Sequence, residues 1–465
     1  MLGIAHHDPA IGRRRFLTIG ALGLGGLSLP SVSALRAASG GRSALTGRSV
    51  VFLFLQGGPS QHETFDPKLD APAGTRTVGG VVPTSVSGVS FGATLERLAG
   101  LAHRLTVVRS FHTGNGGHNI QPIVGPDSLD ANIGVHYSRV AGATRPATGV
   151  PTNAVIFPRA VRADVPKPEA RGDISATGPY GSGYAPFIPG ADGELQQDME
   201  LSVPPERFGD RRHLLAELDR LERRIDASGR LEGFDDVRRQ AYEILLGGGV
   251  ARALDLSRED PATVARYDTS RFAQEGRWDE VSRGRKGYYT AQARTIGHLL
   301  LLARRLCEAG CGYVTIHAGY AGVWDMHADG NNLNMADGME AVGRSFDHAV
   351  AAFVEDVTAR GLEKDILLVI TGEMGRTPRI NKRGGRDHWA RLAPLVLFGG
   401  GAEPGRVVGR SDRAGGEPTT DAYGPKRLIS TILHTVLDAS ELRLEPSVPS
   451  EVLRLMQPEP IPGTV

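Results

Sequence analysis

The sequence predicts an α/β fold: a doubly wound, mostly parallel central sheet flanked by helices, with a largely helical insertion. Two observations carry this prediction. Continuous apolar runs, such as residues 49–55 and 366–370, are typical of strands that helices cover on both faces. These runs alternate along the chain with amphipathic stretches of helical period, and such alternation indicates βαβ units.

The expected elements follow one another from residue 45 onward. The expected strands cover residues 49–55, 105–108, 151–157, 312–317, 366–370 and 393–398. The expected helices cover residues 91–101, 290–306, 335–360 and 425–437. Gly310 and Gly361 stand just beyond two of these helices, where glycine commonly ends a helix. The main domain is therefore expected to span residues 45–445, and residues 446–465 are expected to form a C-terminal tail.

Residues 160–285 differ from the rest of the domain. Residues 160–200 are rich in Gly, Pro and Asp and show no clear periodicity. Residues 205–305 are expected to be mostly helical, because the stretch 211–225 carries an apolar stripe at helical spacing. We expect residues 160–285 to form an insertion or cap on the core.

Residues 1–40 have the features of an export signal. Arg14-Arg15 is followed by Phe16-Leu17, a Gly-rich apolar stretch and then small residues. A twin arginine in this setting points to the twin-arginine export machinery. The apolar stretch is shorter than the ~20 residues that a membrane span needs. We therefore expect a periplasmic or extracellular protein with no stable membrane anchor after cleavage.

Charge and cysteine content narrow the function classes. The 53 basic and 52 acidic residues leave a net charge of +1, so no electrostatic footprint for nucleic acid is present. Cys307 and Cys311 flank the boundary between an expected helix and an expected strand. A disulfide and two buried free thiols both remain open.

Four loops that follow expected strands carry carboxylates or imidazoles. They cover residues 57–68, 109–119, 324–327 and 372–389. In an open α/β sheet the carboxyl ends of the strands meet at one edge, and ligands bind there. Acids and imidazoles gathered at that edge predict a metal or phosphoryl site.

The motifs in these loops resemble a known family. They read Gly57-Gly58-Pro59-Ser60, Trp324-Asp325-Met326-His327, Gly372-Glu373-Met374-Gly375-Arg376 and Asp387-His388-Trp389. Over residues 45–445 the chain resembles domain-of-unknown-function family 1501, exported proteins often found in bacteria. That family is similar to the alkaline phosphatase and sulfatase superfamily. The resemblance implies a central sheet between helices and a metal-dependent hydrolase ancestry.

The resemblance also implies roles for particular residues. A divalent metal, Zn²⁺ or Mn²⁺, would be held by Asp325, His327 and His388. Glu373 would either complete a second metal site or act as a general base. Arg376 or Arg109 would clamp an anionic small-molecule or polymeric ester. Asp387 would orient the imidazole of His388.

The loop after the second strand offers candidates for the remaining catalytic roles. His112 or His118 would be an additional ligand, a nucleophile or the acid that protonates the leaving group. Thr113 stands near the place of the superfamily's nucleophile.

Some positions depart from the superfamily. Gly57 and Gly58 stand where its first strand usually ends in a ligating Asp, and Met374 stands where a two-metal enzyme places its second imidazole. The sequence therefore supports two hypotheses. One is a metal-dependent hydrolase of phosphate or sulfate esters, and the other is a catalytically inactive exported binding or structural protein on the same fold.

Overall fold

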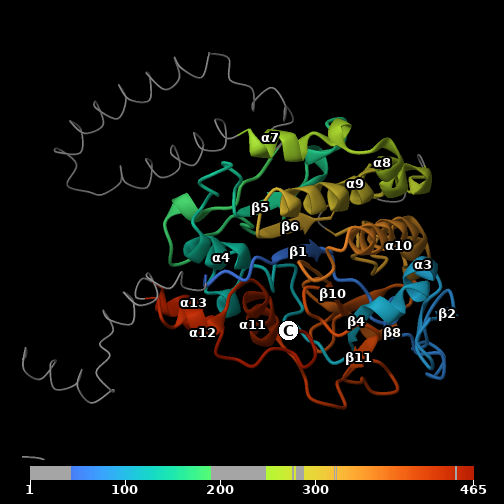
Figure 1. Cartoon of the computed structure of the whole chain (residues 1–465). Coiled ribbons are helices and arrows are strands. Elements are labelled where there is room, and N and C mark those ends of the chain that lie inside the picture. Colours follow the sequence, from blue (N-terminus) through green and yellow to red (C-terminus); the bar gives the residue numbers. More distant parts are fainter. Residues whose placement is uncertain are drawn as a thin grey trace, which may run out of the picture.

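A seven-stranded sheet forms the centre of the protein (Figure 1). The computed structural model describes residues 43–189, 248–274, 277–278, 287–318, 320, 322–445 and 448–465. From edge to edge the strands are β11 (Arg406–Val408), β4 (Leu105–Val108), β10 (Leu395–Gly399), β7 (Ile366–Thr371), β1 (Ser49–Phe54), β6 (Tyr313–His317) and β5 (Asn153–Ile156). Only the pairings of β10 with β4 and β7 are antiparallel among these neighbours. The predicted doubly wound, mostly parallel sheet is confirmed.

Strand β1 shows why both faces of the sheet are covered. Val51 and Leu53 belong to the apolar cluster on one face, whereas Val50 and Phe52 belong to the cluster on the other. Successive side chains of a strand point to opposite faces. Every residue of β1 is therefore buried, which accounts for its continuous apolar sequence.

Helices lie on both faces of the sheet (Figure 1). On one face α9 (Tyr288–Glu308) contacts β1 and β6, and α10 (Met335–Ala359) packs on α9. On the other face α11 (Pro425–Val436) contacts β1, and α4 (Ile133–Ala141) contacts β5 and β6. The helices predicted over residues 290–306, 335–360 and 425–437 are thus confirmed.

The helix predicted over residues 91–101 is wrong in its first half. Phe91 lies instead in β3 (Ser90–Gly92), which pairs with β2 (Val81–Pro83), and helix α3 covers only Glu96–Gly100. A Cβ atom on Gly92 would lie 1.9 Å from the carbonyl oxygen of Glu63. The chain therefore packs directly on the loop that follows β1, a contact that the apolar pattern does not reveal.

The predicted insertion, residues 160–285, is described only in part. Its described residues include α7 (Gly249–Leu254) and α8 (Pro261–Tyr267), and both helices contact α9. Residues 190–247, which include the apolar stripe, and the export signal predicted for residues 1–40 lie outside the described residues. None of the helices within the described ranges is long and apolar enough to cross a membrane.

The C-terminal residues pack against the domain. They follow α12 (Ala439–Leu442) and include α13 (Ser450–Leu455), which contacts α11. Ile461 and Thr464 are buried. The segment predicted as a tail therefore contributes to the core on the α11 face of the sheet.

The two cysteines do not form a disulfide. Cys307 and Cys311 are buried free thiols, and burial raises the pKa of both.

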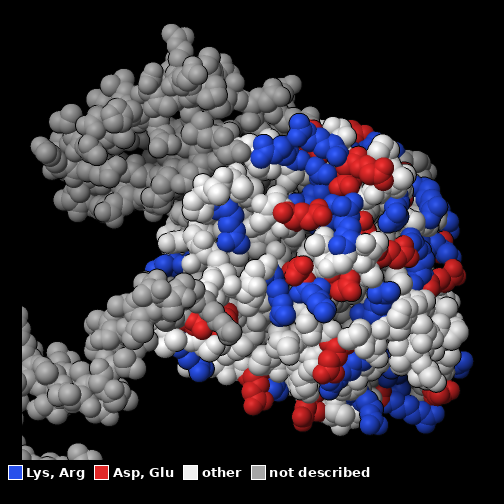
Figure 2. Space-filling model, viewed as in Figure 1, with Lys and Arg blue, Asp and Glu red and all other residues white. Residues whose placement is uncertain are grey.

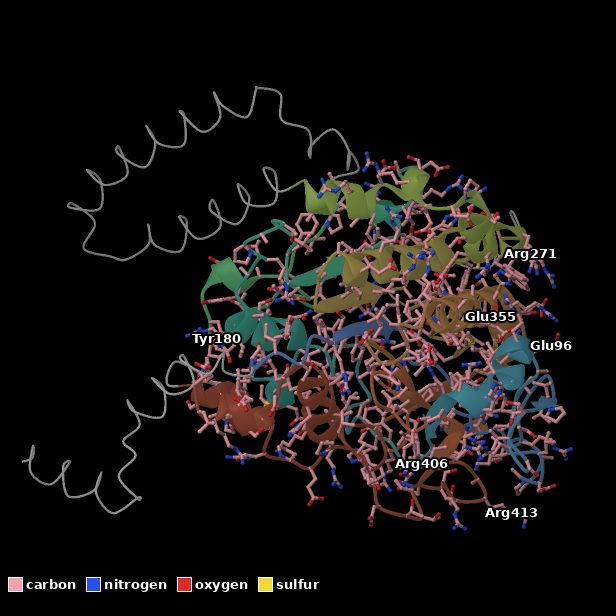
Figure 3. All side chains as sticks on the ribbon, viewed as in Figure 1. Glu96, Tyr180, Arg271, Glu355, Arg406 and Arg413 are labelled. Atoms are coloured by element: carbon pink, nitrogen blue, oxygen red, sulfur yellow. The ribbon has the colours of Figure 1, made fainter. Side chains whose placement is uncertain are left out.

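Basic and acidic side chains are interspersed on the face shown in Figure 2. Glu355 of α10, which is labelled in Figure 3, pairs with Arg97 of α3 at 2.8 Å. Such exposed pairs contribute little to stability.

Candidate metal centre

Loops from four parts of the chain converge at one edge of the sheet. Strands β6, β1 and β7 are parallel neighbours, so the segments that follow them start at the same edge. Asp325 follows β6, and Glu373 follows β7. His118 comes from the loop after β4. His388 lies on β9 (Arg386–Trp389), which forms a hairpin with β8 (Gly375–Ile380).

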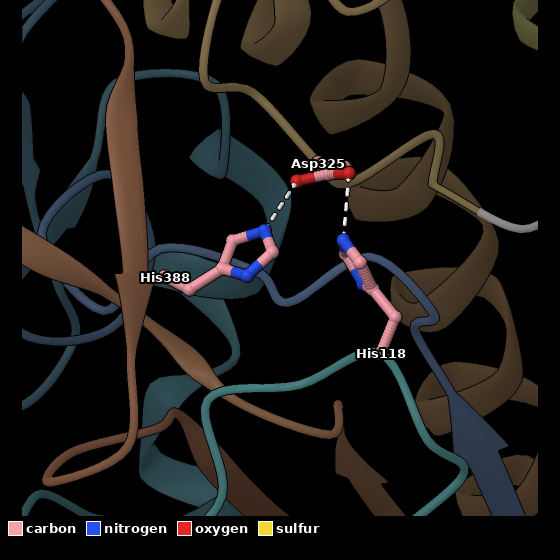
Figure 4. A group of neighbouring side chains, drawn as sticks. All are labelled: His118, Asp325 and His388. Atoms are coloured by element: carbon pink, nitrogen blue, oxygen red, sulfur yellow. Dashed lines mark hydrogen bonds and ion pairs between the residues drawn. The ribbon is translucent and has the colours of Figure 1, made fainter.

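His118, Asp325 and His388 form a compact cluster (Figure 4). Nε2 of His118 lies 2.8 Å from Oδ2 of Asp325, and Nε2 of His388 lies 3.2 Å from Oδ1. One potential ligand atom from each residue lies within 4.8 Å of the other two. The Asp325 side chain is 2% exposed, whereas those of His118 and His388 are 15% and 31% exposed. The cluster is therefore reached from solvent past the imidazoles.

The hydrogen-bonding partners of the imidazoles fit a bound cation. Nδ1 of His388 lies 3.0 Å from the carbonyl oxygen of Gly116, which can only accept a hydrogen bond. A neutral ring that donates from Nδ1 would offer the lone pair of Nε2 to an ion beside Asp325. A protonated ring would instead donate from Nε2 to the carboxylate. Both ring nitrogens of His118 likewise face carboxylate oxygens. A divalent ion between these groups would satisfy the lone pairs and the negative charge together.

Asp325 is held as a carboxylate. Burial favours its neutral form, but hydrogen bonds from His118, His327 and His388 and the charge of Arg376 outweigh burial and hold its pKa well below the usual range. The side chain therefore remains ionised and available as an anionic ligand.

Glu373 contacts the imidazole of His118. Its carboxylate is fully buried and accepts the N–H of Gly57 at 2.8 and 3.1 Å. Oε1 also lies 3.0 Å from Nδ1 of His118. Burial alone would lower the pKa of His118, but its hydrogen bonds to Asp325 and Glu373 raise it. The arrangement thus places Glu373 behind His118, where it orients the ring.

Gly57 permits a close backbone approach to Asp325. A Cβ atom at this position would lie 2.7 Å from the backbone nitrogen of Asp325, and φ of Gly57 is +125°. Both features require glycine. The glycines after β1 therefore bring the backbone against Asp325 instead of supplying a ligand from the first strand.

Arg376 is a fully buried residue that reaches Asp325 from within the protein. Its Nη2 lies 2.8 Å from Oδ1 of Asp325, and its Nε donates to the carbonyl oxygen of Gly58 at 2.8 Å. Its Nη1 donates to the carbonyl oxygen of Arg386 at 3.2 Å. Because protein oxygens engage this guanidinium, the geometry favours a role in holding Asp325 over the predicted clamping of substrate.

His327 contacts Asp325 but stands outside the cluster of three. Its Nε2 lies 3.2 Å from Oδ1 of Asp325 and 3.7 Å from Oδ2 of Asp329. The amide nitrogen of Asn332 lies 3.0 Å from the same Nε2 atom. Of the predicted ligands, Asp325 and His388 therefore lie in the cluster, together with His118, which was predicted as an additional ligand, whereas His327 contacts Asp325 without joining the three.

The other candidates from the loop after β4 have local partners. Arg109 lies 3.3 Å from Asp66 and donates to the carbonyl oxygen of Phe65 at 3.0 Å. The hydroxyl of Thr113 donates to the carbonyl oxygen of Asn115 at 3.1 Å.

His112 lies near the start of α11. Its backbone N–H donates to the carbonyl oxygen of Tyr423, and a Cβ atom on Gly424 would lie 3.2 Å from its ring. Partial burial lowers the pKa of His112. Within the described residues, His118 is the imidazole of this loop that joins the cluster.

Asp387 is exposed, and its carboxylate accepts a hydrogen bond from Asn381 at 3.1 Å. The group that the structure places against Nδ1 of His388 is the carbonyl oxygen of Gly116. A backbone carbonyl therefore occupies the orienting position predicted for Asp387. No side-chain pattern in a sequence could have revealed this contact.

Sequence reasoning also missed a buried ion pair beneath the site. Arg386 is fully buried, and its Nη2 lies 3.0 Å from Oε1 of Glu63. In the loop after β1, His62, Glu63 and Asp66 are all buried. The sequence did carry one signal of this ion pair, the many polar residues of this loop. Buried polar groups require partners, so such a loop predicts buried polar contacts.

Comparisons with known proteins give a family and a set of similar folds. The sequence profile of a family described as "Protein of unknown function (DUF1501)" matches residues 47–443. No functionally curated protein matches the chain.

Three solved structures illustrate the likeness. The PsFucS1 sulfatase from Pseudoalteromonas sp. is 12% identical, with 95% of this chain and 74% of that chain covered and a TM-score of 0.33. The alkaline phosphatase from the Antarctic bacterium TAB5 is 12% identical, with 83% of this chain and 97% of that chain covered and a TM-score of 0.27. The phosphonate monoester hydrolase SpPMH from Silicibacter pomeroyi is 13% identical, with 83% of this chain and 73% of that chain covered and a TM-score of 0.28. Identities and TM-scores this low say nothing about the chemistry of this chain.

Proposed function

The chain belongs to the DUF1501 family, as its motifs predict, and we propose that it is an exported metal-dependent hydrolase of phosphate or sulfate esters. The observation that carries this proposal is the cluster of His118, Asp325 and His388 at the edge where the loops converge. Imidazole and carboxylate donors together suit a borderline divalent ion such as Zn²⁺ or Mn²⁺. The substrate class is an anionic small-molecule or polymeric ester.

Each residue of the centre has a distinct role in this proposal. Asp325 supplies a buried negative charge, and His118 and His388 supply nitrogen ligands. A divalent ion held by these three residues would supply Lewis-acid polarisation of an ester oxygen and a lowered pKa for bound water. Glu373 fixes the ring of His118, and the carbonyl oxygen of Gly116 fixes that of His388. The partial exposure of both imidazoles gives an ester access from solvent.

A second candidate function is ligand binding without turnover. The observation that favours it is the engagement of the predicted nucleophile, because the hydroxyl of Thr113 donates to a carbonyl oxygen of its own loop. A metal-binding protein with this arrangement would retain anionic ligands and release them unchanged.

One set of measurements separates the two functions. We would purify the protein without chelators, measure bound metal by mass spectrometry, and assay sulfate and phosphate mono- and diesters with Zn²⁺ or Mn²⁺. Hydrolysis that Asp325→Ala abolishes supports the hydrolase. His103→Ala, which changes an exposed histidine, is the control and should keep full activity. Metal binding and ester binding without any product would establish the binding protein instead.

Export is a separate part of the proposal. Its support is the Arg14-Arg15-Phe16-Leu17 sequence ahead of a Gly-rich apolar stretch. Fractionation of the native host should place the protein outside the cytoplasm. The double change Arg14→Lys and Arg15→Lys should retain it in the cytoplasm. Unchanged export of this variant would contradict the twin-arginine route.

A further inference from the structure

We propose that Arg376 is a positioning residue that anchors Asp325 and limits the metal centre to one divalent ion. This inference rests on the proposed function, because it presumes that His118, Asp325 and His388 hold an ion. It concerns the number of ions and the residue that sets that number.

The guanidinium of Arg376 is fixed in place. It is fully buried, and its donors reach Oδ1 of Asp325 and the carbonyl oxygens of Gly57, Gly58 and Arg386. An arginine remains protonated under all ordinary conditions. The centre therefore contains a permanent positive charge that cannot swing away from Asp325 without leaving several carbonyl oxygens unpaired.

The two oxygens of Asp325 have different neighbours. Oδ1 lies 2.8 Å from Arg376 and 3.2 Å from both His327 and His388. Oδ2 lies 2.8 Å from His118. A second cation on the Oδ1 side would lie next to the guanidinium. Because the side chains of Arg376 and Asp325 are 0% and 2% exposed, water screens the repulsion between the guanidinium and such a cation poorly.

The balance of buried charge points the same way. Asp325 and Glu373 are buried carboxylates, and Arg376 is the buried guanidinium that contacts one of them. With neutral imidazoles these three groups carry one net negative charge. One divalent ion converts it to a single positive charge, which attracts an anionic ester. Two divalent ions would leave a large uncompensated positive charge in a buried site.

Packing closes the space on the Arg376 side. A Cβ atom on Gly58 would lie 2.5 Å from Cγ of Met374, which is itself buried. The thioether of Met374 is a poor ligand for a hard or borderline cation. The backbone of Gly57 also packs against that of Asp325. The guanidinium is therefore surrounded by backbone and apolar atoms, and His327 and His388 are the imidazoles that reach Oδ1.

The number of ions can be measured without any substrate. We would titrate the metal-free wild-type protein with Mn²⁺ and record both the equivalents bound and the electron paramagnetic resonance spectrum. We expect one equivalent with the spectrum of an isolated ion. Two equivalents with a spin-coupled spectrum would overturn the inference.

A matched pair of variants tests the anchoring role. Arg376→Lys keeps the charge but loses the planar fork, so Asp325 is held less well, and the affinity for Mn²⁺ should fall about tenfold. Arg304→Lys is the control, because Arg304 of α9 is also buried but pairs with Glu259 at 2.9 Å. Its affinity should stay within about twofold of wild type. Equal losses in both variants would overturn the anchoring role. If Arg376→Lys does not fold, the wild-type stoichiometry still decides the number of ions.

The outcomes separate this inference from the proposed function. One bound ion without hydrolysis of any ester contradicts the hydrolase and supports the inference. Two bound ions with hydrolysis contradict the inference and support the hydrolase. Absence of any bound ion contradicts the metal centre on which both depend.

Discussion

The Nδ1 atom of His118 lies 3.0 Å from Oε1 of Glu373, a carboxylate that is fully buried. The other ring nitrogen faces Asp325 at 2.8 Å. The N–H of Gly57 donates to Glu373 as well and fixes the carboxylate in turn. His118 is therefore held from behind and presents Nε2 to the centre, as outer carboxylates commonly orient metal-binding imidazoles.

The first prediction concerns this orienting carboxylate. Glu373→Gln keeps an oxygen that can accept the Nδ1 proton but removes the negative charge behind the ring. The affinity for Zn²⁺ or Mn²⁺ should fall by roughly 10- to 100-fold, as measured by calorimetric titration. Glu355→Gln, a change in a partly exposed carboxylate of α10, is the control and should bind metal normally. Complete loss of the ion with an intact fold would instead identify Glu373 as a direct ligand.

The second prediction distinguishes two imidazoles. His118→Ala should weaken metal binding beyond roughly 100-fold, because a direct ligand is lost, whereas His327→Ala should cost on the order of tenfold or less. The reason is that His327 contacts Asp325 from outside the cluster of three. Equilibrium dialysis with Zn²⁺ compares the two variants under one condition. The reverse order of effects would restore the ligand set of Asp325, His327 and His388.

His118 and His327 mark the limit of what the sequence predicts about the site. The sheet is predictable because a short, unbroken apolar run such as β7 is typical of a strand that is covered on both faces. Asp325 and His388 are predictable because residues after parallel strands meet at one edge. Which imidazole turns toward Asp325 depends on loop conformation. His118 and His327 carry the same side chain, and spacing does not order them.

Arg376 shows a different limit. A charged residue after a strand usually lies in solvent, so the sequence favours contact with an anionic substrate. The structure buries Arg376 completely, because carbonyl oxygens of Gly57 and Gly58 accept its donors. Those acceptors are backbone atoms of a distant loop, and no pattern of side chains encodes their position.

The third prediction concerns the close approach at Gly57. In Gly57→Ala the new Cβ would lie 2.7 Å from the backbone nitrogen of Asp325, and the residue would keep φ near +125°. The free energy of unfolding should fall by about 3 kcal/mol or more, from backbone strain and from displacement of Asp325. Metal affinity should fall with it. Urea unfolding and a Zn²⁺ titration measure the two effects.

The control for this prediction isolates the contact from the strain. Gly79 also has a positive φ, +79°, but nothing lies within 4 Å of a Cβ atom placed there. Gly79→Ala should therefore lower stability by about 1 kcal/mol through strain alone and leave metal affinity unchanged. Equal effects of the two variants on metal binding would show that the contact between Gly57 and Asp325 does not position the ligand.

The fourth prediction concerns stability in acid, through a histidine outside the metal centre. His136 of α4 is fully buried, with Nε2 2.9 Å from the carbonyl oxygen of Ser128 and Nδ1 3.1 Å from the hydroxyl of Tyr180. Burial lowers the pKa of His136 to about 4, although the hydrogen bond to Ser128 opposes the shift. Its unfolded value is 6.5, so between these values the unfolded chain binds more protons than the folded one.

The contribution of neutral His136 to the free energy of unfolding should therefore be fully present above pH 6.5. It should be lost as the pH drops from 6.5 toward 4. The loss from His136 should reach about 3 kcal/mol at the lower end. His136→Gln keeps a donor for Ser128 and an acceptor for Tyr180 but cannot be protonated in this range. Urea unfolding between pH 7 and pH 4 should accordingly show a shallower pH dependence for His136→Gln than for wild type. His103→Gln, at an exposed position, should follow the wild-type curve, and a wild-type slope in His136→Gln would show that this histidine does not limit stability in acid.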